Sequence, residues 1–216
     1  MKLLLSLCLS SLFCSVYTLK CLQCLRGSGQ CSTTDSVDCD TGSVCATLRT
    51  SIDVSGFSVA TTTVARNCLE QSLCSLLSAN STGVTYSTNI GVATFVGFLA
   101  CCNKDNCNDI NIPEPDNTLN GLKCATCKNI LDTVCNTTVS CVGNQDRCVN
   151  NTILDLPVFG SVVSTPAKGC VSKSFCDATT LGSITCCSGN MCNGSKDWLR
   201  LDLSLLLLAL TATMLY

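Results

Sequence analysis

The sequence predicts an all-β fold built from two small, disulfide-rich domains in tandem. Three observations support this prediction. Twenty of the 22 cysteines lie between residues 19 and 193 and make up about 11% of that stretch. The cysteine pattern of the first half is written again in the second. The runs between the cysteines are rich in Val, Thr and Ser and show no helical periodicity longer than two turns.

The first 18 residues have the order of parts of a secretory signal peptide. Met1 and Lys2 are followed by an apolar run from Leu3 to Phe13, and cleavage is expected after Thr18. The alternative, a membrane-spanning helix, needs about 20 apolar residues, and this run is shorter. A signal peptide sends the chain into an oxidising compartment, where disulfides rather than metal thiolates are expected.

The C-terminal end has the order of parts of a glycosylphosphatidylinositol (GPI) signal. An apolar tail, Ser204 to Tyr216, follows a more polar spacer from Lys196 to Leu203 and the small residues Asn193-Gly194-Ser195. Asn193 is the expected attachment residue and Gly194 the second choice, so that residues 194–216 are removed. A transmembrane helix, the alternative, would need a longer apolar run and a basic stop.

Each half of the remaining chain carries ten cysteines in the same order of short and long gaps. Both halves open with Cys-x-x-Cys after Leu-Lys, and both close with Cys-Cys-x-x-x-x-Cys-Asn. We therefore expect a first domain at residues 19–108 and a second at residues 123–193. The intervening linker, residues 109–122, contains two prolines and no cysteine, which indicates a short, stiff connector.

The expected secondary structure consists of two hairpins and one further strand. The first hairpin turns at Asp53-Val54-Ser55-Gly56 and the second at Asp155-Leu156-Pro157. The strands expected are Val44 to Ile52, Phe57 to Cys68, Arg147 to Leu154, Val158 to Thr165 and Ile90 to Cys102.

These motifs resemble the lymphocyte-antigen-6 and urokinase-receptor (LU) family of three-finger domains. The opening and closing cysteine motifs, ten cysteines per half, and the two terminal signals all agree with that family. The resemblance implies two three-finger domains, each with three loops radiating from a cystine-rich palm, and it covers nearly the whole chain between the two signals.

The residues alone leave the disulfide pairing open, because ten cysteines allow about 945 connectivities. The resemblance implies five bonds in the first domain: Cys21–Cys45, Cys24–Cys31, Cys39–Cys68, Cys74–Cys101 and Cys102–Cys107. In the second domain it implies Cys124–Cys148, Cys127–Cys135, Cys141–Cys170, Cys176–Cys186 and Cys187–Cys192. One departure concerns the third finger, which has 26 residues between its seventh and eighth cysteines in the first domain and nine in the second.

The composition argues against several kinds of function. The chain has no histidine, which removes Ser-His and Cys-His nucleophile pairs and the commonest general base. Lys and Arg are not clustered, so no nucleic-acid partner is expected. Asp35, Asp38 and Asp40 lie close together, but a solvated loop is the better interpretation than a catalytic pair. The Cys-x-x-Cys pairs are expected as structural disulfides, because no βαβ pattern accompanies them. We therefore expect no enzyme, no cofactor and no metal.

The remaining motifs concern the surface. Asn80, Asn136 and Asn150 begin N-glycosylation sequons in a chain expected to be secreted. The central finger tips carry large apolar residues where exposed turns are expected: Ile52, Val54, Phe57, Leu154, Leu156 and Phe159. The alternative is that these side chains pack on a neighbouring finger or on the other domain.

The function expected is a GPI-anchored, cell-surface binding protein that presents rigid finger loops to an extracellular protein ligand or receptor, in adhesion, receptor modulation or cell recognition. The alternative is a secreted inhibitor of an extracellular enzyme such as a phospholipase, because the resembled family includes tandem three-finger inhibitors of that kind.

Overall fold

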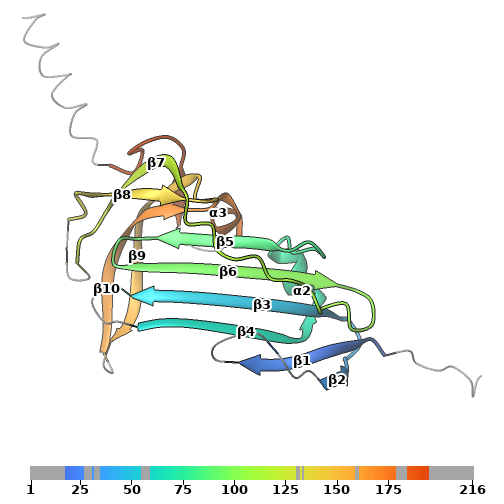
Figure 1. Ribbon diagram of the computed structural model, residues 1–216. Helices are drawn as coiled ribbons and strands as arrows, with labels where there is room; N and C mark the ends of the chain where they lie inside the picture. Colours follow the sequence, from blue (N-terminus) through green and yellow to red (C-terminus); the bar gives the residue numbers. More distant parts are fainter. Residues whose placement is uncertain are drawn as a thin grey trace, which may run out of the picture. The chain divides into compact units, whose positions relative to one another are not determined.

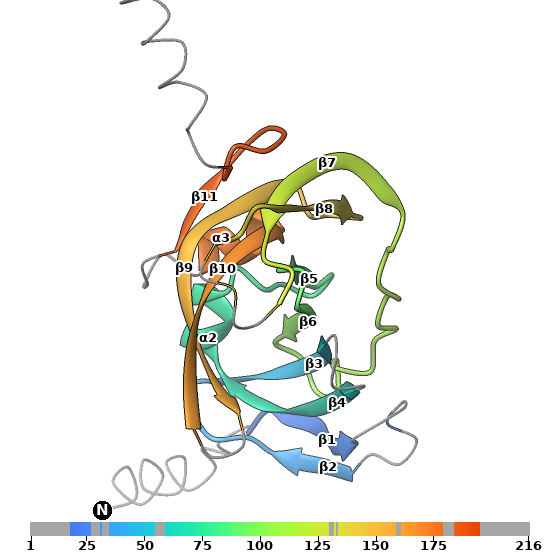
Figure 2. The same ribbon diagram turned by 90° about the vertical axis from the view of Figure 1, so that its left-hand side faces the viewer.

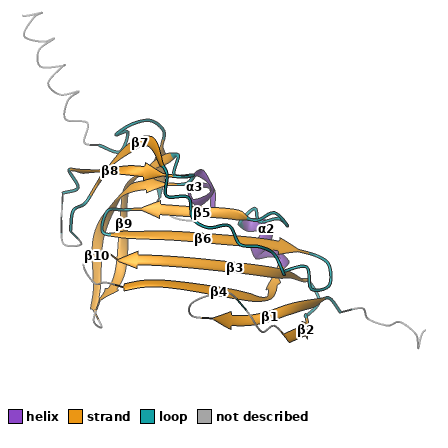
Figure 3. Cartoon of the chain, viewed as in Figure 1, coloured by secondary structure: helices purple, strands orange, loops and turns teal. Residues whose placement is uncertain are grey.

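The computed structural model of the chain describes residues 18–26, 31, 35–54, 59–129, 132, 134–158, 161–178 and 184–194. Most of these residues lie in β-strands, as Figure 3 shows. The predicted all-β, disulfide-rich fold class is thus confirmed. The predicted signal peptide up to residue 17 and the tail from residue 195 lie outside the described residues. In the described part of the chain, no helix is both long and apolar enough to cross a membrane.

The described elements are eleven strands and two six-residue helices (Figure 1). In chain order they are β1 (Lys20–Arg26), β2 (Asp35–Asp38), β3 (Ser43–Val54), β4 (Val59–Glu70), α2 (Gln71–Leu76), β5 (Val84–Asn89), β6 (Ala93–Cys102), β7 (Leu119–Thr126), β8 (Thr137–Val142), β9 (Arg147–Val158), β10 (Ser161–Val171), α3 (Lys173–Ala178) and β11 (Thr185–Cys187).

The strands form a nine-stranded sheet of order β11-β9-β10-β5-β6-β3-β4-β1-β2 and a separate β7-β8 pair. The chain divides into two compact units that do not follow the two cysteine repeats. The first unit comprises residues up to 48, residues 64–83 and residues 99–111. The second comprises residues 49–63, residues 84–98 and residues from 112 onwards.

In its described residues the first unit contains a buried cluster of cystines, and Val44, Val64 and Leu99 are buried in it as well. Cys21, Cys39 and Cys45 form its buried cluster. Strand β1 pairs antiparallel with β2 on one side and with β4 on the other. A domain of this size buries little apolar surface, so covalent links replace part of the core.

The second unit has a larger apolar core, formed by Ile90, Val92, Val149, Ala167 and Val171. Its longest feature is the β9–β10 hairpin, whose strands pair antiparallel from the 158/161 end to the 147/171 end (Figure 2). Strand β11 pairs with the base of β9. The core therefore lies at the base of this hairpin.

The predicted turn at Asp155–Pro157 is wrong. These three residues belong to β9, and Pro157 lies opposite Val162 of β10. Asp and Pro are turn signals in sequence, but proline is also tolerated in a strand that has a partner on one side only. In the described residues, β11 covers β9 only as far as Asn150, so the outer half of β9 offers Pro157 such an edge.

Strand β5 was not predicted, and it accounts for the enlarged third finger of the first repeat. It pairs antiparallel with β10 of the second repeat, Cys170 opposite Asn89 and Val171 opposite Thr88. The Ser172 amide donates to the Ser87 carbonyl at 2.8 Å, which continues this ladder. The extra residues of the long loop therefore supply a strand that extends the sheet of the second unit.

Gly169 permits this close approach of β5 and β10. A Cβ atom at position 169 would lie 2.0 Å from the Asn89 carbonyl oxygen and 2.7 Å from the Ile90 Cα. Both neighbours are main-chain atoms, so no side-chain rotation can relieve the overlap. The position is closed to every side chain unless the two strands separate.

Gly169→Ala should therefore weaken the β5–β10 pairing and destabilise the protein by about 1–3 kcal/mol, the usual cost of overpacking. Chemical unfolding measures the loss, and hydrogen exchange should show faster exchange of the Ser172 amide. Lys168→Ala, the neighbouring change, is the control and should leave both values near those of the wild type. An unchanged exchange rate in Gly169→Ala would contradict the assignment of this contact.

Candidate functional site

Ten disulfides hold the bases of the loops in the described residues. In the first repeat they are Cys21–Cys45, Cys24–Cys31, Cys39–Cys68, Cys74–Cys101 and Cys102–Cys107. In the second repeat they are Cys124–Cys148, Cys127–Cys135, Cys141–Cys170, Cys176–Cys186 and Cys187–Cys192. These are the same pairs as the family resemblance implied.

Two groups of three sulfurs lie close enough together to suggest a metal site. They are Cys21, Cys39 and Cys68 in the first repeat, and Cys124, Cys141 and Cys170 in the second, each within 4.8 Å. All six sulfurs are in disulfides. Because the thiolate is the form of cysteine that binds metal, these clusters are stacked cystines rather than ligand sets.

A buried asparagine follows the last cysteine of each repeat and binds main-chain groups. The Asn108 amide donates to the Leu22 and Ala46 carbonyls at 2.9 and 3.1 Å, and its Oδ1 accepts from the Leu22 amide at 3.0 Å. Its side chain is 1% exposed. One side chain thus joins the end of the repeat to both β1 and β3.

Asn193 makes the same three bonds in the second repeat. Its Nδ2 donates to the Ala125 and Val149 carbonyls at 2.9 and 2.7 Å, and its Oδ1 accepts from the Ala125 amide at 2.8 Å. It is fully buried. The Asn193 side chain therefore has a structural role, and its buried amide would not be accessible to a glycan.

The segment before each asparagine is duplicated as well. The Lys20 amide donates to Asp105 Oδ1, and the Lys123 amide donates to Asn190 Oδ1, both at 2.9 Å. The next residue in each segment has a positive φ, 53° at Asn106 and 55° at Met191. The two repeats therefore share a closing turn in detail and not only a cysteine pattern.

Asn108→Ala should destabilise the protein by about 2 kcal/mol or more, because it removes the partners of the buried Ala46 carbonyl and of the partly buried Leu22 amide and carbonyl, and an unsatisfied buried group costs about 1–3 kcal/mol. Urea unfolding under oxidising conditions measures the change. Asn103→Ala is the control, since Asn103 lies exposed in the same closing segment. Equal stabilities for the two variants would show that the buried amide contributes nothing.

The predicted finger-tip residues are only partly described. Ile52, on β3, is 46% exposed, and Val54 is half-buried. Phe57 and Phe159 lie outside the described residues, as do the side chains of Leu154 and Leu156, although both leucines belong to β9. Ile52 alone among the six is thus placed as an exposed apolar side chain.

The other sequence-predicted surface residues lie where solvent reaches them. Asn80 and Asn136 are exposed, and the side chain of Asn150 lies outside the described residues. Asn80 Oδ1 accepts hydrogen bonds from the main chain of Thr82 and Gly83, so this sequon forms a turn. Asp35, Asp38 and Asp40 are all exposed to solvent as expected, but the predicted loop is wrong for Asp35 and Asp38, which lie at the two ends of strand β2 because β2 pairs with β1.

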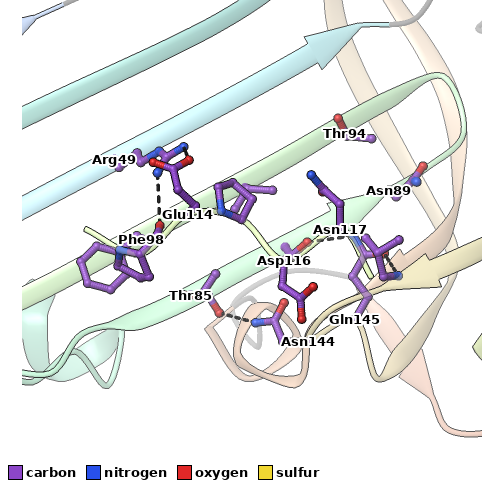
Figure 4. Close-up of a pocket in the computed structure, with 15 residues that line it drawn as sticks. Arg49, Thr85, Asn89, Thr94, Phe98, Glu114, Asp116, Asn117, Asn144 and Gln145 are labelled. Carbon is purple, nitrogen blue, oxygen red and sulfur yellow. Dashed lines mark hydrogen bonds and ion pairs between the residues drawn. The ribbon is translucent and has the colours of Figure 1, made fainter. Parts of the chain in front are cut away.

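A cavity of about 370 Å³ in the second unit lies beside the linker, and we call it the connector pocket. Figure 4 shows the linker residues Glu114, Asp116 and Asn117 running across the view from Arg49 towards Gln145. Its other walls are strands β5 and β6 and the β8–β9 turn. The polar side chains that line it, apart from those of the linker, are Arg49, Thr85, Ser87, Asn89, Thr94, Asn144 and Gln145.

Arg49 and the β8–β9 turn hold the linker over this pocket. Arg49 donates to the Pro113 carbonyl at 3.1 Å and to Glu114 Oε2 at 2.9 Å (Figure 4). Farther along, Asn120 donates to the carbonyls of Gly143 and Gln145, both at 3.0 Å. The linker is therefore fixed at two places and is a wall of the pocket.

The charges of the linker are set by their partners. The Arg49 guanidinium holds the pKa of Glu114 below its usual value, and hydrogen bonds from Thr118 lower the pKa of Asp116. Both carboxylates are exposed and ionised at neutral pH. The pocket accordingly presents two negative charges and one guanidinium that is already paired, together with amide and hydroxyl groups.

The sequence did not indicate this pocket. Arg49 and Glu114 are 65 residues apart, and only the fold brings them together. The one usable signal is the Pro-Glu-Pro-Asp run of the linker, which places acidic side chains on a stiff segment.

Replacing Arg49 with glutamine should raise the pKa of Glu114 towards its usual value, because Arg49 supplies both the hydrogen bond and the positive charge that lower it. The ion pair favours the folded state above the usual pKa, and this contribution is lost as the pH falls through the lowered pKa. NMR titration of the labelled Glu114 carboxyl carbon measures the shift. Lys173→Gln, which removes an exposed pair with Asp177, is the control. The same midpoint in Arg49→Gln and wild type would refute the pairing.

Comparison with known proteins finds relatives of low sequence identity. No protein-family model matches the chain. It is 29% identical over 138 residues to phospholipase A2 inhibitor LNF1 of Lachesis muta muta, and 26% identical over 137 residues to phospholipase A2 inhibitor CgMIP-I of Cerrophidion godmani. Each match covers 62% of this chain and 64% of the relative, so it spans less than two thirds of the relative's length.

Among solved structures, the crystal structure of mouse TEX101 aligns with 80% of this chain and 99% of its own, at 14% sequence identity and a TM-score of 0.32.

Proposed function

We propose that this chain is an extracellular binding protein whose disulfide-held hairpins present their tips to a protein ligand or receptor. The observation that carries the proposal is the duplicated frame of five disulfides and one buried asparagine at the base of the hairpins. A loop that is already ordered loses less conformational entropy when it binds. Such a frame therefore favours binding by preformed loops.

The proposed architecture has two three-finger domains in tandem, residues 19–108 and 123–193, after a signal peptide of residues 1–18. A lipid anchor at Asn193 or Gly194 would hold the chain on the outer leaflet of the cell membrane, with residues 194–216 removed. The buried side chain of Asn193 is compatible with this proposal, because a lipid joined to the main-chain carboxyl group would leave the three side-chain bonds in place.

The proposed contact residues are Ile52, Val54, Phe57, Leu154, Leu156 and Phe159, together with their tips. Ile52 supports this assignment, since a large apolar side chain that is 46% exposed gains free energy when a partner covers it. Carbohydrate at Asn80, Asn136 and Asn150 would restrict which faces a partner can reach.

A second candidate function is inhibition of an extracellular phospholipase. It is favoured by one observation: the two relatives are named phospholipase A2 inhibitors. Both candidates act by binding a protein, and neither requires catalytic chemistry in this chain. They differ in where the protein resides and in what it binds.

The test expresses the full chain in cells and follows it with an antibody. We expect the chain on the cell surface and its release by phosphatidylinositol-specific phospholipase C, because a GPI anchor contains the bond which that enzyme cleaves. The released protein should not slow a secreted phospholipase A2. Full secretion without enzyme treatment, together with inhibition of the phospholipase, would replace the first candidate with the second.

A further inference from the structure

A second cavity of the second unit is about 300 Å³ in volume and open to solvent, and the surface that its described residues expose to it is all carbon, although Thr88 and Thr94 are among them. We call it the apolar pocket. Phe95 of β6 and Phe175 of α3 lie on its wall with their rings edge to face, 6.5 Å between centroids. The wall also includes three residues of the apolar core, Ile90, Val149 and Val171. Ile52 lines the pocket as well, and its side chain is the one that solvent reaches most, with 46% exposed.

The chemistry of this wall restricts what can fill it. Water against this wall gains no hydrogen bond from the carbon surface that the described residues expose, so releasing it costs little. A peptide segment would bring main-chain N–H and C=O groups, and each of these would lose its hydrogen bonds at a cost of a few kcal/mol. The residues that line the pocket are also uncharged, so an ionic group finds no partner there.

A hydrocarbon chain meets all of these restrictions. It has no donor, no acceptor and no charge, and each methylene buried against carbon gains free energy from the hydrophobic effect. The cavity volume is at the lower end of the range for small-molecule sites, which is about 300–1,000 Å³. An uncharged pocket of this size, open on one side, can hold an alkyl chain while a polar head group stays in water.

We propose that the apolar pocket binds the alkyl chain of a lipid. The third finger of the first repeat and the β9–β10 hairpin build the site together, because Thr88 and Phe95 come from the former and Val149 and Val171 from the latter. This inference does not depend on the proposed function. The chain could bind a protein through its tips with or without an alkyl chain in this pocket.

The experiment titrates a dansyl-labelled undecanoic acid into the full chain, which is collected from the medium or released from cells by phosphatidylinositol-specific phospholipase C. No detergent is used. We expect saturable binding with a blue shift of the dansyl emission, and displacement by unlabelled decanoic acid but not by acetate. Acetate carries the same carboxylate without the chain, so it separates burial of hydrocarbon from binding of an anion.

Two substitutions, each at a residue that lines the pocket, test whether the probe binds there. Ile52→Asp puts a charge at the exposed side and should weaken the affinity at least tenfold. Leu48→Asp, on the same strand, is the matched control: Leu48 is 40% exposed and lines neither cavity, so its replacement should leave the affinity unchanged. Ala93→Phe fills the pocket from within and should also abolish binding. Near-ultraviolet circular dichroism and a free-thiol assay verify that each variant is folded.

Absence of probe binding to the wild type overturns the proposal. Equal affinities of Ile52→Asp and Leu48→Asp overturn it as well, because the probe would then bind elsewhere. Light scattering tests whether a second copy of the chain covers the pocket instead: a dimer that Ile52→Asp dissociates and that decanoic acid leaves intact contradicts a lipid occupant. Failure of surface release or of protein binding would affect only the proposed function.

Discussion

The fold depends on one set of hydrogen bonds that occurs in both repeats. The asparagine at the end of each repeat binds the main chain just after the first and the fifth cysteine of that repeat. Asn108 and Asn193 each satisfy three main-chain groups with one amide. Beside them, Cys102–Cys107 and Cys187–Cys192 fix the turn that delivers the asparagine. An amide is suited to this position because it both donates and accepts, whereas a carboxylate could only accept and would bury a charge.

These hydrogen bonds and disulfides explain how repeats with small apolar cores can hold long hairpins. The cystines occupy the space that large apolar residues fill in other proteins, and their bonds reduce the freedom of the unfolded chain. Strands β9 and β10 extend well beyond the cystines that fix their bases, at Cys148 and Cys170. In the proposed function, these fixed bases would hold the hairpin tips that contact the partner.

The enlarged third finger of the first repeat changes the architecture of the second unit. By pairing β5 with β10, it places Phe95 against Phe175 and brings β6 near the linker that Arg49 holds. Two cavities of different character result: the connector pocket is lined by amide, hydroxyl and carboxylate groups, and the apolar pocket exposes only carbon from the described residues. Thr94 lines both. The second unit therefore contains two cavities whose walls come from both cysteine repeats.

The sequence by itself determined the all-β, cystine-rich fold class and indicated the repeated pattern, because cysteine spacing and the alternation of β-prone residues are local properties. It left open whether Ile52 would be exposed or would pack on a neighbouring loop, and the structure shows it 46% exposed. The pairing of the cysteines came from family resemblance.

Only the tertiary structure decided the course of β5, the place of Pro157 inside β9, and the meeting of Arg49 with Glu114. Each of these depends on which strands lie side by side, and residues far apart in the chain carry no local signal of their contact. The same reason explains why neither pocket could be predicted: a cavity is defined by what several elements leave unfilled between them.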